Sequence, residues 1–319
     1  MMKNSVLIAD KFPDSAIEEL KSLGLEVTYS PKLGEQDLVS AAVDTNIIVV
    51  RSTVVNADTI NSANNLKLII RAGSGVNNIN IPAAKAKGVY VANCPGMNSI
   101  AVAELAIGLI ISLDRRIPSN VIDFHSGIWN KGEYSKAEGL FGKNIAIVGY
   151  GAIGKEVAKR ALAFGMKVYA KDVFPIDDPN VTVFTEFENT LPEMDAISFH
   201  LPSNAQTKGL INKEVLSLLK PGCIIVNTSR ADIIDEDALL EAVETKKLKV
   251  ALDVFKGEPE QKDGAVSSKF VGKNNIYVTH HIGASTEQAQ NAVSAESIRI
   301  IKEFITNGVN SPNLKKNIL

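Results

Sequence analysis

Short apolar runs alternate with amphipathic segments along most of the chain. In the first part, five such runs are rich in β-branched residues: SVLIAD, EVTYS, IIVVRS, LKLIIRAG and VYVANC. Residues 15–23, 35–43 and 57–63 lie between these runs and have the apolar spacing of helices. Buried parallel strands read as nearly continuous apolar runs, and strands that alternate with helices build a parallel sheet. The pattern predicts a complete α/β domain before residue 99.

A long helix is predicted next, over residues 99–113, and a polar, glycine-bearing connection over residues 119–143. The alternation then resumes, with strands in IAIV, KVYA, AISFH, CIIVNTS, VALDVF and IYVTHH and helices over residues 212–219 and 236–244. A last helix is predicted over residues 286–305. We expect this helix to cross back to the first domain.

The fold class that follows is α/β, with two Rossmann-like domains that each contain a parallel sheet. The first domain is expected to be discontinuous, combining residues 1–98 with residues 287–319. The second domain is expected to comprise residues 99–286. A chain that crosses twice between domains forms a hinge, and the cleft between such domains is a usual place for a substrate.

The segment from Ile145 to Asp172 predicts a dinucleotide site. Gly149, Gly151 and Gly154 form G-x-G-x-x-G between a predicted strand and a predicted helix. In such a unit the first glycine makes the tight turn, the second lets the backbone approach the pyrophosphate, and the third lets the helix pack on the strand. The N-terminus of the helix attracts a diphosphate. A unit that binds nothing, or one that binds S-adenosylmethionine or a flavin, is the alternative.

Asp172 indicates which dinucleotide is bound. It ends the second strand of the unit, 18 residues after Gly154, where an acid usually accepts hydrogen bonds from the ribose 2′-OH. The same carboxylate repels a 2′-phosphate, and Val173 and Phe174 follow without an arginine. NAD is therefore favoured over NADP. Lys171 is the one nearby cation that weakens this preference.

Composition places the chain among soluble globular proteins. It has 319 residues, of which 45% are hydrophobic and 22% charged, and a formal net charge of −2, which fits two substantial cores. It has no basic block to bind nucleic acid or an anionic membrane, and no apolar stretch long enough for a signal peptide or a membrane span. Its two cysteines make neither a disulfide framework nor a zinc site. We expect a cytoplasmic protein without a metal, in which Cys94 is a small buried residue.

Two candidate catalytic groups follow strand ends in the second domain. Hydride transfer between a nicotinamide and an alcohol needs a base for the hydroxyl proton and a cation for the anionic end of the substrate. His281, in VTHHIGAST, can serve as base or acid because its ordinary pKa is near neutrality. Strand alternation sends His280 and His281 to opposite sides, and the sequence does not choose between them. Arg230, after CIIVNTS, can grip a carboxylate or form a surface salt bridge with Asp232 or Asp235.

Glu258, in LDVFKGEP, is the candidate partner of the histidine. A carboxylate against His281 would fix the tautomer of the imidazole and raise its pKa. The alternative for a single glutamate in a polar loop is a solvated charge.

Six segments in order carry a resemblance to a known family. They are RAGSGVNNIN, NCPGMNSIAVAELAIGLI, IVGYGAIGKEVAKRALAFGMKV, VNTSRADIIDEDAL, ALDVFKGEP and THHIGAST. Over about residues 47–295 the chain resembles the D-isomer-specific 2-hydroxyacid dehydrogenases, and within them the phosphoglycerate dehydrogenase branch. The resemblance implies NAD-dependent oxidation of D-3-phosphoglycerate to 3-phosphohydroxypyruvate, the first step of L-serine biosynthesis. It also implies a short form without a C-terminal regulatory domain, and hence no serine feedback through such a domain.

The resemblance implies a role for each candidate catalytic residue. Arg230 would bind the substrate, Glu258 would support the histidine, and His281 rather than His280 would transfer the proton. The chain departs from the family at His280, where proline is usual. It departs again after Arg230, where Ala231 and Asp232 replace residues that are commonly small.

The resemblance also implies two sets of binding residues. In the substrate domain, backbone N–H groups of residues 72–74 are expected to form a carboxylate nest, and two arginines in one site favour a substrate with a second anionic group. Asp253 is expected to hold the nicotinamide carboxamide. The cofactor set is Gly149, Gly151, Ala152, Ile153, Gly154, Asp172, His200, Leu201, Pro202, Thr207, Thr228, Ser229, Arg230, Asp253, His281, Gly283 and Ser99; the substrate set is Arg51, Ser52, Arg71, Ala72, Gly73, Ser74 and Asn98.

A homodimer joined through the NAD-binding domains is implied as well, with Lys131 adding charge to the site of the neighbouring subunit. Two alternatives to phosphoglycerate oxidation stay open. One is the same chemistry on glyoxylate, hydroxypyruvate, D-lactate or a branched 2-keto acid. The other, of a different class, is an NAD-sensing corepressor-like protein that binds partner peptides.

Overall fold

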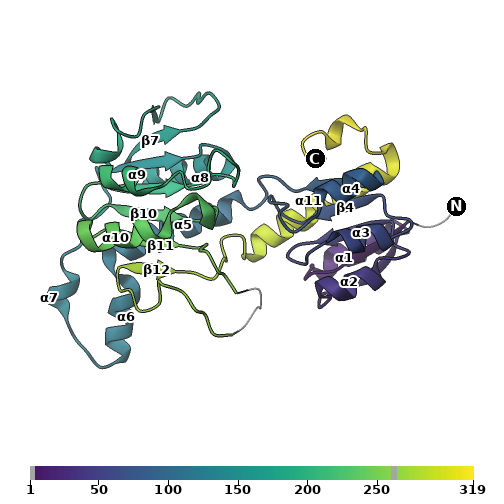
Figure 1. Cartoon of the computed structure of the whole chain (residues 1–319), viewed down its shortest axis with the longest axis horizontal. Coiled ribbons are helices and arrows are strands. Elements are labelled where there is room, and N and C mark those ends of the chain that lie inside the picture. The colour runs from purple at the N-terminus through teal and green to yellow at the C-terminus, as the bar shows by residue number, and fades with distance from the viewer. Residues whose placement is uncertain (1–3, 260–263) are drawn as a thin grey trace. The chain divides into compact units, whose positions relative to one another are not determined.

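Two parallel sheets organise the chain (Figure 1). The computed structural model describes residues 4–259 and 264–319. They form a first unit, Met1–Asn98 with Ser285–Leu319, and a second unit, Ser99–Ala284. All neighbouring strands of the two described sheets pair in parallel. This confirms the predicted α/β class with two parallel sheets.

The first unit has a five-stranded sheet in the order β2-β1-β3-β4-β5. The order reverses beside β1, which pairs with both β2 and β3, and the carboxyl edge at such a reversal is the usual ligand crevice of an open α/β sheet. The strands are β1 (Ser5–Ile8), β2 (Glu26–Tyr29), β3 (Ile47–Val50), β4 (Leu68–Arg71) and β5 (Tyr90–Asn93). The helices are α1 (Asp14–Ser22), α2 (Glu35–Ala41), α3 (Ala57–Ser62), α4 (Ile81–Lys87) and α11 (Glu287–Asn307), followed by the 3₁₀ turn η3 (Pro312–Leu314).

Helices cover both faces of this sheet. Val6 faces a core that includes Leu20 of α1 and Ile301 of α11. Leu7, the next residue of β1, faces the other core, with Leu38 of α2, as strand alternation requires. Burial of each such side chain contributes about 1.5–3 kcal/mol. Because α11 supplies part of the first core, the end of the chain is needed to complete this unit.

The second unit has a seven-stranded sheet in the order β12-β11-β10-β9-β6-β7-β8. The reversal lies at β6, which pairs with β7 and β9. The strands are β6 (Asn144–Val148), β7 (Lys167–Lys171), β8 (Thr182–Val183), β9 (Ala196–Phe199), β10 (Ile224–Asn227), β11 (Lys249–Leu252) and β12 (Ile276–Val278). The helices are α5 (Ser99–Arg115), α6 (Ile117–His125), α7 (Lys131–Tyr134), α8 (Ala152–Ala163), α9 (Lys213–Leu218) and α10 (Glu236–Lys246), with 3₁₀ turns η1 (Leu191–Glu193) and η2 (Ala231–Ile233).

Two cores hold the second sheet. On one face, Ile147 packs in a core with Ile110 of α5 and Val157 of α8. On the other face, Val148 packs in a core with Leu216 of α9 and Leu239 of α10. The strand ends that carry the candidate residues are thus anchored from both sides.

Three helices differ from the sequence prediction. α4 has no apolar stripe, since its sequence is IPAAKAK, and it was not predicted. α6 and α7 lie in the region predicted as a polar connection. Val121, Ile122 and Phe124 of α6 are exposed to 49%, 64% and 66%, so this helix does not bury the stripe by which a surface helix is usually recognised. Among the helices of the described chain, none is both long and apolar enough to cross a membrane.

Candidate active site

The glycine turn follows β6 at the reversal of the second sheet. Gly149 has φ +98°, and a Cβ there would collide with the carbonyl oxygen of His200. A Cβ on Gly154 would collide with the carbonyl oxygen of Gly149 and lie 3.2 Å from Ile147. A Cβ on Gly151 would meet nothing within 4 Å. Two of the glycines therefore permit close backbone packing, while the third leaves open space at the N-terminus of α8.

Asp172, at the end of β7, bonds the glycine turn of the neighbouring strand. Its Oδ2 accepts a hydrogen bond from the Tyr150 N–H at 2.6 Å, and its Oδ1 accepts one from the Phe174 N–H at 3.0 Å. The Tyr150 hydroxyl donates to Asp178 at 2.7 Å. A carboxylate has about four acceptor positions, so Asp172 retains capacity for ribose hydroxyls. Ala152 and Ile153 form the first turn of α8 beside it.

Lys171 is directed to other partners. Its ammonium donates to the carbonyl oxygen of Thr185 and lies 5.9 Å and 5.3 Å from the ring centroids of Phe184 and Phe187. The cation whose position could favour a 2′-phosphate is thereby engaged with the segment after β8.

The loop after β9 begins with His200, Leu201 and Pro202. Burial lowers the pKa of His200 to about 3, so the ring is neutral at physiological pH. Its Nε2 lies 2.9 Å from the Ser198 hydroxyl. The Thr207 hydroxyl donates to the carbonyl oxygen of Pro202 at 2.6 Å, which closes the loop on itself. Leu201 packs against the core of the unit.

Arg230 follows β10, and Asn227 holds its turn. Asn227 is 1% exposed; its Oδ1 accepts from both the N–H and the hydroxyl of Ser229, and its Nδ2 donates to the carbonyl oxygen of Arg230 at 2.8 Å. Arg230 itself donates to the Ser229 carbonyl oxygen at 2.7 Å. Sequence reasoning did not identify Asn227, because it reads as the last residue of an apolar strand.

The predicted alternative for Arg230, a salt bridge with a neighbouring acid, is not formed within the described chain. Asp232 accepts a hydrogen bond from the Ser203 hydroxyl at 2.6 Å and lies 3.8 Å from Lys208. Asp235 caps α10 by accepting from two backbone N–H groups. Both acids therefore have other partners, and the binding of substrate by the Arg230 guanidinium, which donates to the Ser229 carbonyl, stays a prediction.

His281 is paired with Glu258. Its Nδ1 lies 2.8 Å from Glu258 Oε2, while Glu258 Oε1 accepts from the Phe255 N–H at 3.0 Å. The hydrogen bond with Glu258 raises the pKa of His281, and burial and the charge of Arg230 oppose the rise. The His281 side chain is 58% exposed, so substrate can reach it. Glu258 thus distinguishes the two adjacent histidines, a choice the sequence left open.

The turn that carries His281 is held by Asp253. One carboxylate oxygen of Asp253 accepts from the Thr279 hydroxyl at 2.6 Å and the Ile282 N–H at 2.9 Å, and the other from the Gly283 N–H at 2.9 Å. His281 has φ +52°, a conformation that costs about 1 kcal/mol or more for a residue other than glycine. Asp253 therefore compensates local strain at the candidate acid/base. Its expected contact with the carboxamide stays a prediction.

In the first unit, the side chain of Asp10, which follows β1, holds the loop that follows β3. A single carboxylate oxygen of Asp10, which is 7% exposed, accepts from the N–H groups of Arg51, Ser52 and Thr53 at 2.6, 2.9 and 2.9 Å. The Arg51 guanidinium donates to the Ser285 hydroxyl at 3.3 Å. Sequence reasoning missed Asp10, although it ends the first strand.

The predicted carboxylate nest needs the backbone N–H groups of residues 72, 73 and 74 to be free, and two of the three are not. The Ala72 N–H donates to the Val50 carbonyl at 2.7 Å and the Gly73 N–H to the Arg71 carbonyl at 2.8 Å, so the sheet and the turn use two of the three donors. Gly73 has φ +149°, and a Cβ there would collide with the Arg71 guanidinium. The cation thus lies over its own loop and takes the place expected of the nest.

Ser74 and Asn98 do lie together, since the Ser74 hydroxyl donates to Asn98 Oδ1 at 3.0 Å. The predicted substrate residues of the first unit therefore gather at the carboxyl edge of β3 to β5. The predicted cofactor and catalytic residues gather at the carboxyl edge of the second sheet, apart from Ser99 at the start of α5.

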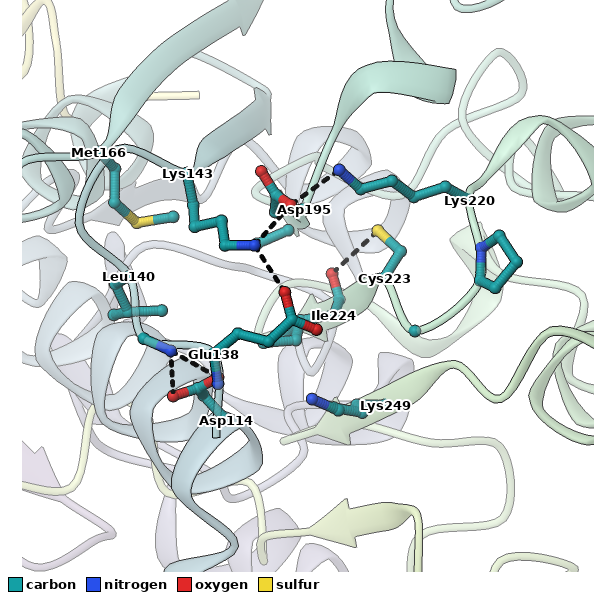
Figure 2. A pocket seen from close by; sticks show the side chains of 14 residues that line it. Asp114, Glu138, Leu140, Lys143, Met166, Asp195, Lys220, Cys223, Ile224 and Lys249 are labelled. Carbon is teal, nitrogen blue, oxygen red and sulfur yellow. Dashed lines mark hydrogen bonds and ion pairs between the residues drawn. The ribbon is translucent and has the colours of Figure 1, made fainter. Parts of the chain in front are cut away.

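The second unit also has a pocket of about 270 Å³ at the amino edge of its sheet (Figure 2). Lys143 lies 2.5 Å from Glu138 and 3.6 Å from Asp195, and Lys220 lies 2.7 Å from Asp195. These residues precede strands, whereas the candidate residues follow them. The pocket's charges neutralise one another, and it takes no part in the candidate site.

Four buried side-chain polar atoms of the second unit have no hydrogen-bond partner within the described chain: Ser99 Oγ, His200 Nδ1, Thr228 Oγ1 and Asp232 Oδ1. Such atoms usually find a partner, because each costs about 1–3 kcal/mol without one. The hydroxyls, carboxamide and adenine of a dinucleotide offer suitable partners. With the open space above Gly151, the residues present fit NAD.

Comparison with known proteins agrees with this geometry. The family model described as D-isomer specific 2-hydroxyacid dehydrogenase, NAD binding domain, matches residues 107–283. A hydroxypyruvate reductase of Thermotoga maritima is 42% identical over 283 residues, which cover 88% of this chain and 91% of that protein. A D-3-phosphoglycerate dehydrogenase of Methanocaldococcus jannaschii is 37% identical over 320 residues, 97% of this chain and 60% of that protein. The crystal structure of NAD⁺-bound 3-phosphoglycerate dehydrogenase from Entamoeba histolytica matches with a TM-score of 0.81 and 30% identity, covering 96% of this chain and 97% of that chain.

The chain belongs to the D-isomer specific 2-hydroxyacid dehydrogenases. It is an NAD-dependent enzyme of that family, which confirms the predicted family, enzyme class and cofactor. It spans most of the length of the Thermotoga hydroxypyruvate reductase but only 60% of the Methanocaldococcus phosphoglycerate dehydrogenase. The specific substrate is not decided by membership of the family.

Replacement of Glu258 by glutamine tests the histidine pair. The neutral amide removes the charge that raises the pKa of His281, so the pKa should fall. With His281 as the predicted acid, reduction of a 2-keto acid declines as pH rises through that pKa, so the kcat/KM profile should move to lower pH. The measurement is kcat/KM against pH for any accepted keto acid, with Glu244→Gln as the control. An unshifted profile in Glu258→Gln would contradict the pairing.

Two alanine substitutions separate cofactor binding from stability in the glycine turn. Gly154→Ala should lower the melting temperature by several degrees or more, because its Cβ meets the Gly149 carbonyl. Gly151→Ala should melt close to wild type and yet bind NADH at least about tenfold more weakly, because its Cβ enters the open space needed by the diphosphate. Calorimetry and NADH fluorescence titration give the two quantities. Wild-type NADH affinity in Gly151→Ala would exclude this position for the diphosphate.

Proposed function

We propose that the chain is a D-3-phosphoglycerate dehydrogenase, which oxidises the 2-hydroxyl of its substrate to the keto group of 3-phosphohydroxypyruvate. The register of the first sheet carries this proposal. Val50 pairs with Arg71, so Arg51, the residue after Val50, and Arg71 leave neighbouring strands at the same edge. Two guanidinium groups there suit a substrate with both a carboxylate and a phosphate. The named relatives that are phosphoglycerate dehydrogenases support the same substrate.

In this proposal the second unit performs the chemistry. Glu258 accepts the Nδ1–H of His281, which leaves Nε2 as the base in the oxidation direction. Nε2 takes the C2 hydroxyl proton, and Glu258 stabilises the imidazolium that forms. Arg230 holds the carboxylate and stabilises negative charge on the C2 oxygen. Bound NAD supplies the hydride acceptor, held by the glycine turn, Asp172 and the loops after β9 and β10.

A second candidate function is hydroxypyruvate reduction, which the 42% identity to the Thermotoga enzyme favours. The proton and hydride steps would be the same. The two candidates differ in the need for a phosphate site, and therefore in the role of Arg51 and Arg71.

We also propose that the enzyme is a homodimer joined through its second units. The support is a set of exposed apolar side chains in α6 and in the segment that connects it to β6, with Ile122 exposed to 64%, Phe124 to 66%, Trp129 to 80% and Phe141 to 88%. Large exposed apolar surfaces mark protein interfaces. Lys131, at the start of α7, would then lie at the interface. A cytoplasmic location is in keeping with Cys94 and Cys223, which are free thiols.

Oxidation of NADH by the purified enzyme tests the substrate. With 3-phosphohydroxypyruvate, kcat/KM should far exceed the values for hydroxypyruvate, glyoxylate and pyruvate, and NADPH should serve poorly. A preference for hydroxypyruvate would replace the first candidate by the second. If the enzyme reduces none of these acids, the interpretation as an NAD-sensing protein would be favoured.

Arg71→Ala tests the phosphate site directly. Loss of a charged hydrogen bond should lower kcat/KM for 3-phosphohydroxypyruvate by about 10- to 100-fold, with a smaller loss for glyoxylate, which has no phosphate. Arg115→Ala, which removes an exposed cation of the other unit, is the control. Equal losses on the two substrates would assign Arg71 to the carboxylate instead.

Sedimentation velocity tests the dimer. The double variant Ile122→Glu/Trp129→Glu should sediment as a monomer, because charge on the apolar surface opposes its burial. Val271→Glu, at another exposed apolar residue of the same unit, should keep the wild-type state. A wild type that is monomeric at micromolar concentration would refute the proposal.

A further inference from the structure

The last residues of the chain run back along β5, the edge strand of the first sheet. Ala92 and Ile318 form an antiparallel bridge. The Asn93 N–H donates to the Asn317 carbonyl at 2.9 Å, and the Leu319 N–H donates to the Val91 carbonyl at 3.0 Å. The open edge of the sheet is therefore paired by the C-terminal segment, residues 312–319 (the yellow end of the chain in Figure 1).

Asn317 is the most constrained residue of this segment. It is 0% exposed. Its Nδ2 donates to the Asn93 carbonyl at 2.9 Å and to Glu296 at 3.0 Å, and its Oδ1 accepts from Arg299 at 2.7 Å. Arg299 and Glu296 of α11 form an ion pair at 2.8 Å, which lowers the pKa of Glu296. Every polar atom of the Asn317 side chain is thus used, and the residue is fixed from two sides.

Asn93 passes this constraint to the loop of the neighbouring strand. Its Nδ2 donates to the Ser74 carbonyl at 2.7 Å, and the N–H of the next residue, Cys94, donates to the Gly73 carbonyl at 2.9 Å. Residues at the end of β5 therefore fix two successive carbonyls of the loop over residues 71–74. That loop carries Arg71, whose guanidinium lies over Gly73, so a shift of the loop backbone moves the cation.

We propose that Asn317 and Asn93 are positioning residues for substrate binding: the C-terminal segment sets the loop of Arg71 through a relay from Asn317 to Asn93 to the Ser74 carbonyl. The inference rests on the proposed function only in that Arg71 contacts the anionic substrate. The relay lies within the first unit, whereas the cofactor and proton-transfer residues lie in the second. Its loss should therefore weaken substrate binding and leave cofactor binding intact.

The test uses Asn317→Ala and Asn93→Ala in the full chain. The KM of the best keto acid should rise about fivefold to tenfold, the size expected for one buried hydrogen bond that positions a charged group. kcat at saturating substrate should stay within about twofold of the wild-type value, and the NADH dissociation constant should not change. The reason is that the variants weaken the binding of substrate and transition state equally, so KM rises while kcat is kept. Hydrogen exchange of a peptide that contains residues 70–78 should become faster in both variants. The double variant should resemble the single ones, because both break one relay.

Leu314→Ala is the matched control for stability. Leu314 lies in the same segment and is 0% exposed, but it packs in the apolar core and is not part of the relay. It should lower the melting temperature while KM stays at the wild-type value. Asn313→Ala, which removes a polar contact to Glu303, controls for loss of an amide in the segment.

Several results would overturn the inference. Unchanged exchange of residues 70–78 in Asn93→Ala would show that the relay does not hold the loop. A KM increase in Leu314→Ala as large as in Asn317→Ala would reduce the effect to general loosening. Faster exchange with an unchanged KM would refute the role in substrate binding. In that case, a lower kcat/KM in Arg71→Ala would leave the proposed function intact. An unchanged kcat/KM in Arg71→Ala would show that the proposed function itself is wrong.

Discussion

The carboxylate of Asp253 accepts three hydrogen bonds from the turn that carries His281, and this arrangement has counterparts along both sheets. Asp253 follows β11 and bonds the loop after β12, its neighbour. Asp172 follows β7 and bonds the loop after β6. Asp10 follows β1 and bonds the loop after β3, and Asn93 ends β5 and bonds the loop after β4. In each case a short polar side chain at one strand end fixes the loop of the adjacent strand.

The cause lies in the geometry of a parallel sheet. Beyond the carboxyl ends of the strands the ladder stops, while the loop backbone still has N–H and C=O groups that need partners. Aspartate and asparagine reach such groups across the strand spacing of about 4.8 Å, and a buried carboxylate is tolerated when several N–H groups bond it. The loops that carry Arg51, Arg71 and His281 are therefore ordered by their neighbours. The loop of Arg230 is the exception, since it is held by Asn227 at the end of its own strand.

The pattern explains what the sequence could and could not predict. The eleven predicted strands, the close backbone packing at Gly149 and Gly154 and the pairing of Glu258 with His281 depend on local spacing or on segments with a recognisable motif, and the structure agrees with them. Asp10, Asn227 and Asn317 act through contacts between residues that are distant or unremarkable in sequence. The carboxylate nest was misjudged because the sequence does not show that the sheet already uses the Ala72 N–H. α6 was missed because its apolar side chains point outward, where only a partner would bury them.

The departures of this chain from its family fit the same arrangement. Asp232, where a small residue is usual, is bonded by Ser203 from the loop after β9, so its charge joins two neighbouring loops and does not pair with Arg230. His280, in place of proline, is exposed beside the strained His281, whose backbone N–H is bonded to the Asp253 carbonyl at 3.0 Å. In the proposed function, by contrast, substrate choice depends on the loops of Arg51 and Arg71, which belong to the first unit. The family model matches residues 107–283, so it does not include these two loops, and membership of the family leaves the proposed phosphate site undecided.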